Sequence, residues 1–143
     1  MLEIEIKKLN QMEILEVSNF IYNIFDIKDK CNFYKKNLHY CINPRVLIAK
    51  INEEIVGHIL IHEKYDSKKD KKIFYLDFIF VKENMRGNGI CSKMLKKIEE
   101  LANLENISYI EFTSNNKRIS AHKCYLKNEY KQKESTIFIK DIV

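Results

Sequence analysis

The chain has 143 residues, a length typical of one domain. Hydrophobic residues make up 45% of it, which is enough for a packed core and too much for a disordered chain. The formal net charge of +5 suits an anionic ligand such as a phosphate-bearing cofactor, and the lack of a basic block or a nucleic-acid motif argues against nucleic-acid binding.

The cysteines and the apolar runs exclude further classes. Four widely spaced cysteines form no CxxC pair, so we expect no metal site and free thiols in a reducing cytosol; they are Cys31, Cys41, Cys91 and Cys124. No apolar run approaches the roughly 20 residues of a membrane span, and the N-terminus does not resemble a signal peptide. The sequence therefore predicts a cytoplasmic protein that makes no contact with a membrane.

The first part of the chain is expected to form one strand and two helices. Alternating apolar residues predict a strand over 2–8, and apolar residues at helical spacing predict a helix over 11–25. A second helix is expected over 28–40. It should end before Pro44, because a proline disfavours helix in the residue before it.

Two apolar, β-branched runs follow, over 45–51 and 54–65. Asn52-Glu53-Glu54 lies between them, so the pattern predicts a β-hairpin. Gly57 inside the second run indicates a bulge or a close approach of a neighbouring element.

The rest of the chain alternates strands with helices. In order, we expect a polar loop over 66–72, a central strand over 73–81, a helix over 89–104, a strand over 107–113, a helix over 116–127, and one or two closing strands over 130–142. This order predicts an α/β (α+β) fold in a single domain over residues 1–143. Its mixed sheet should have about six to seven strands, flanked by about four helices.

A buried strand, a tight turn and a helix start meet at Arg86-Gly87-Asn88-Gly89-Ile90-Cys91. The two glycines allow several backbone N–H groups to point at one spot, and the helix N-terminus adds unpaired donors and a partial positive charge. Arg86 and Lys82 add full charges. The segment therefore predicts a site for a phosphate or pyrophosphate.

The loop alone does not identify the phosphate ligand. A Walker A motif is absent, and the loop lies too late in the chain, after several strands, for a dinucleotide-binding fingerprint. A glycine-rich helix start that binds no ligand remains an alternative at this point.

Two blocks of sequence carry a resemblance to a known family. Met85 to Cys91 resemble motif A of the GNAT superfamily of acetyltransferases, in its common form Arg-Gly-x-Gly-Ile-small. Residues 115–130 resemble its motif B, at the family's spacing from the first block. Glu129-Tyr130 stands where the family usually has Gly-Phe. Asn128 tolerates a left-handed backbone better than Glu129, so we expect the helix to end one residue earlier.

The resemblance implies a fold in which two strands splay apart and the pantetheine arm of acetyl-CoA lies in the gap. The backbones of Ile79, Phe80 and Val81 would line that arm. The residues implied around the pyrophosphate are Arg86, Gly87, Asn88, Gly89, Ile90, Cys91 and Ser92, with Asn116 as a further cofactor contact. The implied protein is a metal-independent N-acetyltransferase that moves the acetyl group directly to a primary amine, and a homodimer is compatible with the family.

The implied reaction needs a proton donor for the leaving sulfur and a route for the proton of the amine. Tyr125 stands at the family's general-acid position, and a tyrosine of pKa about 10 is a reasonable donor. Asp77 interrupts the apolar run 74–81 and is our first candidate for the base; Glu111 is the second. Tyr125 and Asp77 each have a structural alternative to the catalytic role. Tyr125 could be a core aromatic residue, and Asp77 could be a carboxylate paired with a basic residue. Many relatives rely on ordered water instead.

Two other functions remain open: a catalytically inactive sensor that binds acyl-CoA, and a basic module that binds nucleic acid. We expect His58 and His62, four apart in a strand, to be structural, and His122 to orient its neighbours. The acceptor pocket is expected near residues that carry both charge signs, so they favour no acceptor class: Asp26, Lys28, Asp29, Lys30, Tyr34 and Tyr40.

Overall fold

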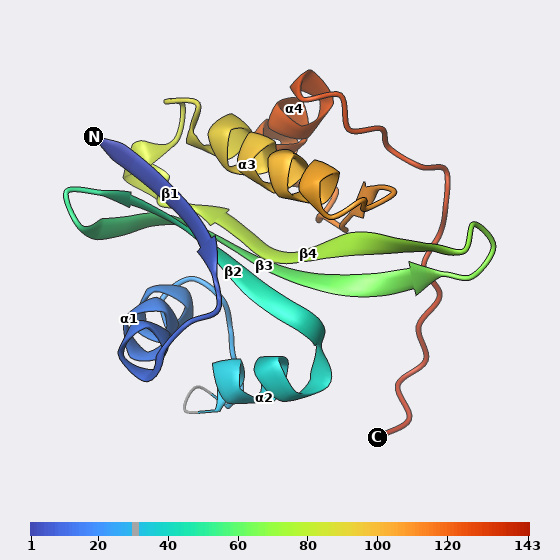
Figure 1. The fold of residues 1–143 in the computed structure, drawn as a ribbon, viewed down its shortest axis with the longest axis horizontal. Helices are drawn as coiled ribbons and strands as arrows, with labels where there is room; N and C mark the ends of the chain where they lie inside the picture. The colour runs from blue at the N-terminus through green and yellow to red at the C-terminus, as the bar shows by residue number, and fades with distance from the viewer. Residues whose placement is uncertain (30–31) are drawn as a thin grey trace. The chain divides into compact units, whose positions relative to one another are not determined.

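The structure, a computed structural model, describes residues 1–29 and 32–143 (Figure 1). Lys30 and Cys31 lie outside the described residues, and so do the predictions made for them. Backbone contacts divide the chain into two compact units, Met1–Thr113 and Ser114–Val143. A single domain over residues 1–143 therefore stays a prediction.

The first unit is built on a mixed sheet with the strand order β1-β2-β3-β4-β5. Neighbouring strands are antiparallel except β4 and β5, which are parallel. The strands are β1 (Leu2–Lys7), β2 (Ile42–Ile51), β3 (Glu54–Asp66), β4 (Lys71–Val81) and β5 (Ile110–Glu111). The predicted fold class is confirmed, with five strands in the described chain rather than six to seven.

The middle of the sheet is β3, and not the strand over 73–81 that the sequence favoured for that place. Seven consecutive β3 residues, Ile55 to Ile61, are buried, because both faces of this strand are covered. β4 lies one position from the edge.

The β2–β3 hairpin forms as predicted. Asn52 and Glu53 have φ angles of 50° and 66°, the left-handed pair that a type I′ hairpin turn requires. Pro44 lies inside β2 instead of in a loop. It sits at a register shift between Ile42 and Arg45, where a strand can lose one ladder hydrogen bond.

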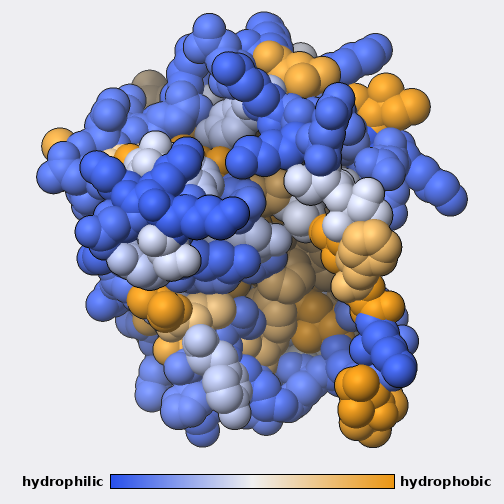
Figure 2. Space-filling view, turned by 90° about the vertical axis from the view of Figure 1, so that its right-hand side faces the viewer, coloured by the Kyte–Doolittle hydropathy of each residue, from blue (hydrophilic) through white to orange (hydrophobic). Residues whose placement is uncertain are grey.

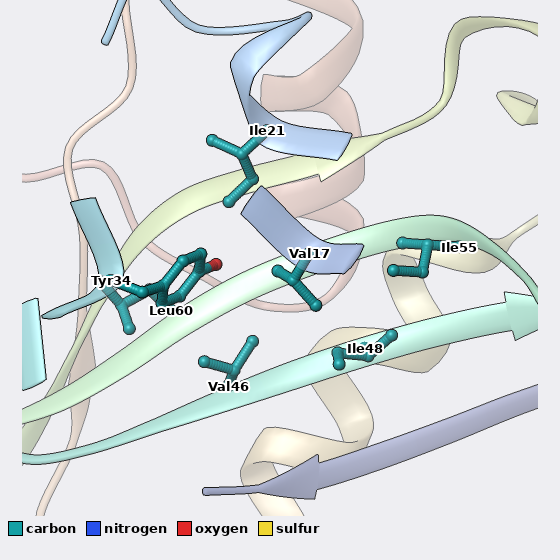
Figure 3. Close-up of a cluster of buried hydrophobic side chains, with 7 residues drawn as sticks. All are labelled: Val17, Ile21, Tyr34, Val46, Ile48, Ile55 and Leu60. Atoms are coloured by element: carbon teal, nitrogen blue, oxygen red, sulfur yellow. The ribbon is translucent and has the colours of Figure 1, made fainter. Parts of the chain in front are cut away.

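Two helices cover one face of this sheet, α1 (Gln11–Tyr22) and α2 (Phe33–Tyr40). A capping box starts α1: Oδ1 of Asn10 accepts from the Glu13 amide at 2.9 Å, and Oε1 of Glu13 accepts from the Asn10 amide at 3.1 Å. Figure 3 shows the core beneath these helices, made of Val17, Ile21, Tyr34, Val46, Ile48, Ile55 and Leu60.

The opposite face carries α3 (Ile90–Leu104), which follows a short 3₁₀ turn at Glu83–Met85 (Figure 1). Its buried stripe is Ile90, Met94, Leu95, Ile98 and Ala102. Gly57 marks a close approach, as predicted, because a Cβ atom there would lie 2.5 Å from Sδ of Met94. The glycine therefore sets how near α3 comes to β3.

The second unit contains α4 (Ile119–Lys127). The helix ends in a Schellman motif: the Tyr130 amide donates to the Tyr125 carbonyl at 3.0 Å, and the Glu129 amide donates to Leu126 at 3.1 Å. Glu129, rather than Asn128, adopts the left-handed backbone, with φ of 68°. The predicted closing strands are wrong: residues 130–143 contain no helix or strand.

The face that Figure 2 shows is largely hydrophilic, with scattered hydrophobic side chains. No helix in the described part of the chain is long and apolar enough to cross a membrane.

Candidate functional site

β4 and β5 pair over a short distance and then part. The Ser108 amide donates to the Lys72 carbonyl at 3.0 Å, and the Phe74 amide donates to Tyr109 at 3.1 Å. The last pair in register is Tyr75 with Glu111, after which β4 continues alone to Val81. Within the described residues of the first unit, the stretch 76–81 therefore has an open edge. An open edge can pair with the amides of an extended ligand.

A β-bulge interrupts β4 on its other side. The β3–β4 register steps from His58 opposite Phe80 to Leu60 opposite Asp77, so Ile59 faces two residues of β4. Phe78, in the bulge, has φ of 52°, which is rare for an aromatic residue. Bulges of this kind re-aim backbone and side chains, and they occur often beside active sites.

The turn into α3 is shaped for an anion. Gly87 and Gly89 have φ angles of 84° and 75°, and a Cβ atom added to either would meet nothing within 4 Å. Gly89 caps α3 without a side-chain hydrogen bond. No group in the described chain accepts a hydrogen bond from the backbone amides at 87–90. Unpaired N–H groups, open space and a helix N-terminus fit a phosphate.

The cationic side chains near this turn are already engaged. Nε of Arg86 donates to the Val81 carbonyl at 3.0 Å, and the guanidinium lies 5.1 Å from the centre of the Phe80 ring. Nζ of Lys82 is paired with the Glu54 carboxylate. The terminal nitrogens of Arg86 therefore remain available to a ligand, whereas Lys82 forms an exposed ion pair with Glu54.

The remaining predicted cofactor residues in this unit lie along β4 and the first turn of α3. Ile79 and Ile90 are buried, so only their backbones can face a ligand. Cys91 and Ser92 are half-buried at the start of the helix. The side-chain Nδ2 of Asn88 donates to the Met85 carbonyl at 3.0 Å and thereby shapes the turn.

Asp77 lies beside a histidine. Its Oδ2 atom is 2.8 Å from Nε2 of His62, and both residues lie on the face covered by α1 and α2, since Asp77 is opposite Leu60. Within the described chain, Oδ1 of Asp77 has no hydrogen-bond partner, and 40% of the Asp77 side chain is exposed. Burial, with a smaller contribution from the Asp77 charge, raises the pKa of the Cys41 thiol, which places Cys41 near this carboxylate.

Aromatic and basic side chains adjoin this pair. The Tyr75 ring is 5.3 Å from the His62 ring, and Nζ of Lys64 lies 3.7 Å from the Tyr75 ring centre. Glu111 is exposed and in register with Tyr75, so it projects on the same face of the sheet as Asp77. The structure thus brings both base candidates to one face and gives only Asp77 a histidine partner.

A second histidine, His58 of β3, is buried and contacts the bulge in β4. Nδ1 of His58 lies 2.9 Å from the Phe78 carbonyl, and its Nε2 contacts the Tyr34 hydroxyl. Burial lowers the pKa of His58 from 6.5 to about 4, and burial raises the pKa of Tyr34. His58 is therefore neutral at physiological pH.

The other predicted residues belong to the second unit. Tyr125 lies on α4, with its ring 6.2 Å from that of His122. Nε2 of His122 is 3.1 Å from Oγ of Ser114. Asn115 holds the turn before α4, because its Oδ1 accepts from the Lys117 amide at 2.9 Å, while Asn116 is exposed.

Sequence reasoning treated His58 and His62 only as structural, and it overlooked the bulge at Phe78. The signal available in the sequence was the four-residue spacing of His58 and His62, which puts both on one face of β3. The register with β4 adds Asp77 to that face. No cluster of three or more metal-ligating side chains occurs among residues 1–29 and 32–143.

Comparison with known proteins gives a family match. The model of the acetyltransferase (GNAT) family matches residues 11–130. The aminoalkylphosphonate N-acetyltransferase of Salmonella typhimurium is 32% identical over 111 residues, which cover 78% of this chain and 68% of that protein. The thialysine N-epsilon-acetyltransferase of Bos taurus is 34% identical over 73 residues, which cover 49% of this chain and 42% of that protein.

Solved structures share the fold. The aminoglycoside N-acetyltransferase AAC(6')-Iy, in complex with a bisubstrate analogue of CoA and acetylneamine, has a TM-score of 0.79 with 99% of each chain covered. Its sequence identity of 12% limits this likeness to the fold.

Proposed function

Because the chain belongs to the acetyltransferase (GNAT) family, we propose that it transfers an acetyl group from acetyl-CoA directly to the primary amine of a small molecule. Family membership confirms the predicted resemblance and the predicted class, an N-acetyltransferase with acetyl-CoA as co-substrate. The acceptor and the residues that act on it are our proposals.

The observation that carries the proposal is the Asp77–His62 pair beside the bulge in β4. Nε2 of His62 donates to Oδ2 of Asp77 and orients the carboxylate. Oδ1 is left for an ammonium group or for the proton that an amine loses. A carboxylate on the edge of a sheet, partly exposed, can do both.

The backbone groups next to Asp77 suit the co-substrate. Acetyl-CoA, when bound, supplies the acetyl group as a thioester. The unpaired amides at 87–90 would bind the pyrophosphate, and the open edge at 76–81 would pair with the pantetheine amides. Arg86 would add charge through the nitrogens that Val81 does not use.

The proposed transfer forms a bond between the amine nitrogen and the acetyl carbon and breaks the carbon–sulfur bond. Asp77 takes the proton from the amine and later releases it to water. Tyr125 gives a proton to the departing sulfur and regains one from water. A thiol of pKa about 8.5 needs only modest help to leave at neutral pH, so we expect Tyr125 to matter less than Asp77. Glu111 remains the second candidate for the base.

The names of the two relatives support a small amine as acceptor. Aminoalkylphosphonate and thialysine both carry a primary amino group on a short chain. Asp77 is well placed to hold such a cation before it is deprotonated.

An acetyl-CoA turnover screen with a panel of small primary amines tests the proposal, on wild type and Tyr125→Phe. We expect CoA release with at least one amine, reduced in the variant. Binding of acetyl-CoA without CoA release from any amine would instead support the sensor. Salt-sensitive nucleic-acid binding that ignores acetyl-CoA would support the basic module.

A further inference from the structure

Two buried hydrogen bonds in series connect α2 with the bulge in β4. The Tyr34 hydroxyl contacts Nε2 of His58, and Nδ1 of His58 lies 2.9 Å from the Phe78 carbonyl. Tyr34 is 1% exposed and His58 is 0% exposed. Figure 3 shows Tyr34 among the side chains of the core cluster.

The chemistry of the partners fixes the direction of both bonds. A carbonyl oxygen only accepts, so Nδ1 of His58 carries the hydrogen and donates it to Phe78. Nε2 is then a lone pair, and the Tyr34 hydroxyl donates to it. One neutral tautomer satisfies both contacts, and replacement of either partner leaves a buried polar atom unpaired.

Phe78 is also held through its ring. The Phe25 ring lies 5.2 Å away and the Phe33 ring 5.0 Å away, both edge-on. A left-handed aromatic residue is costly and persists only when its surroundings fix it. Here the carbonyl of Phe78 is fixed from the sheet, and its ring is fixed by α2 and by the bend that follows α1.

The residues next to Phe78 belong to the proposed site. Asp77 precedes it and Ile79, on the open edge, follows it. A change of φ at Phe78 would therefore rotate Asp77 and Ile79 relative to each other. Displacements of about 1 Å in an active site can cost about 100-fold in rate.

We propose that Tyr34 and His58 are positioning residues, which hold the Phe78 bulge and with it Asp77 and Ile79 in the geometry that acetyl transfer requires. The proposal rests on the proposed function of Asp77. It also couples α2, an element expected near the acceptor, to the reacting edge of β4.

Three variants separate the two hydrogen bonds. His58→Leu removes both, His58→Asn leaves an amide N–H that can reach Phe78, and Tyr34→Phe removes only the outer bond. Ile55→Val is the matched control, since it trims the same core at a β3 residue that lies opposite Lys50 of β2, outside the bulge. For each, kcat and KM for both substrates are measured, together with hydrogen–deuterium exchange of residues 77–81.

We expect kcat to fall about 100-fold in His58→Leu with little change in KM for acetyl-CoA, and to recover by about tenfold in His58→Asn. The kcat of Tyr34→Phe should lie between those of wild type and His58→Leu. Exchange at residues 77–81 should accelerate in Tyr34→Phe and His58→Leu but not in Ile55→Val.

Equal kcat losses in Ile55→Val and His58→Leu would overturn the proposal, as would a His58→Asn variant no better than His58→Leu. If wild type acetylates no amine, the proposed function fails. Hydrogen–deuterium exchange of residues 77–81 then tests the positioning role by itself. Faster exchange in Tyr34→Phe supports the proposal that Tyr34 holds the bulge, and unchanged exchange rejects it. Tyr34→Phe keeps the core volume, so this arm survives if His58→Leu does not fold.

Discussion

The Asp77 carboxylate and the His62 imidazole meet across two antiparallel strands, with Oδ2 and Nε2 2.8 Å apart. They lie next to the point where β4 bulges and leaves β5. This contact distinguishes Asp77 from Glu111, which is exposed.

Substitution of Asp77 should therefore affect the rate more than substitution of Glu111. We expect Asp77→Asn to lower kcat by about 100-fold or more, in the range of general-base catalysis. His62→Gln should lower it less, because a glutamine amide can still donate to the carboxylate. Steady-state CoA release with the best amine measures both, and Glu111→Gln is the control. A larger loss in Glu111→Gln would move the base to β5.

At Gly87 and Gly89 there is room for a larger side chain, but the positive φ of the backbone disfavours any residue other than glycine. An alanine at Gly87 or Gly89 meets open space, yet a positive φ costs an L-residue roughly 1–2 kcal/mol. We expect Gly89→Ala to weaken CoA binding by about tenfold as φ relaxes, and Gly89→Asn to weaken it less. Calorimetric titration with CoA measures this, and equal affinities would show that the loop amides do not bind the pyrophosphate.

Substitution of Gly57 is predicted to be destabilising because there is no space for a side chain, in contrast to Gly87 and Gly89. Its φ is ordinary, but an added Cβ would collide with Met94, so Gly57→Ala should lower the free energy of unfolding by about 1–3 kcal/mol. Met94→Leu combined with Gly57→Ala should recover part of the loss. Urea denaturation of the single and double variants gives the coupling energy, and strict additivity would argue against the contact.

His58 predicts a pH dependence of stability. Its pKa is lowered from 6.5 to about 4, so between these values the unfolded chain binds a proton that the folded chain does not. Stability should fall as pH drops from about 6.5 to 4, by about 3 kcal/mol from this group. The difference between wild type and His58→Asn, measured by denaturation at several pH values, isolates it from the carboxylates. Parallel curves would mean that His58 protonates freely in the fold.

Glu129 predicts a stabilising substitution in the second unit. It adopts a left-handed backbone at the end of α4, where glycine is the usual residue. Glu129→Gly should raise the free energy of unfolding by up to about 1 kcal/mol, since relief of strain outweighs the added freedom of the unfolded chain. Thermal unfolding measures the change, with Asn128→Gly as the control, because Asn128 has φ of −91°. A rise in the control alone would place the left-handed residue at 128.

The parts of the fold that the sequence predicted are those with local causes. The Asn52-Glu53 turn, the apolar stripe of α3 and the two glycines of the loop each act within a few residues. The central place of β3 depends instead on what covers both of its faces. The predicted closing strands over 130–142 did not form, because a strand also needs a neighbouring ladder.

The site was predictable in composition but not in geometry. Asp77 was singled out because a carboxylate is unusual in an apolar strand, yet its partner His62 depends on the β3–β4 register, which the bulge shifts. The bulge itself has no signature at Phe78. It is fixed by His58 from β3 and by Phe25 and Phe33 from distant segments.

The contact between Gly57 and Met94 also bears on how such a sequence can diverge. A side chain at position 57 becomes acceptable only after position 94 has shrunk, and a smaller residue at 94 leaves a void until 57 has grown. Each order of events passes through a less stable protein. The two positions should therefore be inherited as a pair, and homologues should vary at both or at neither.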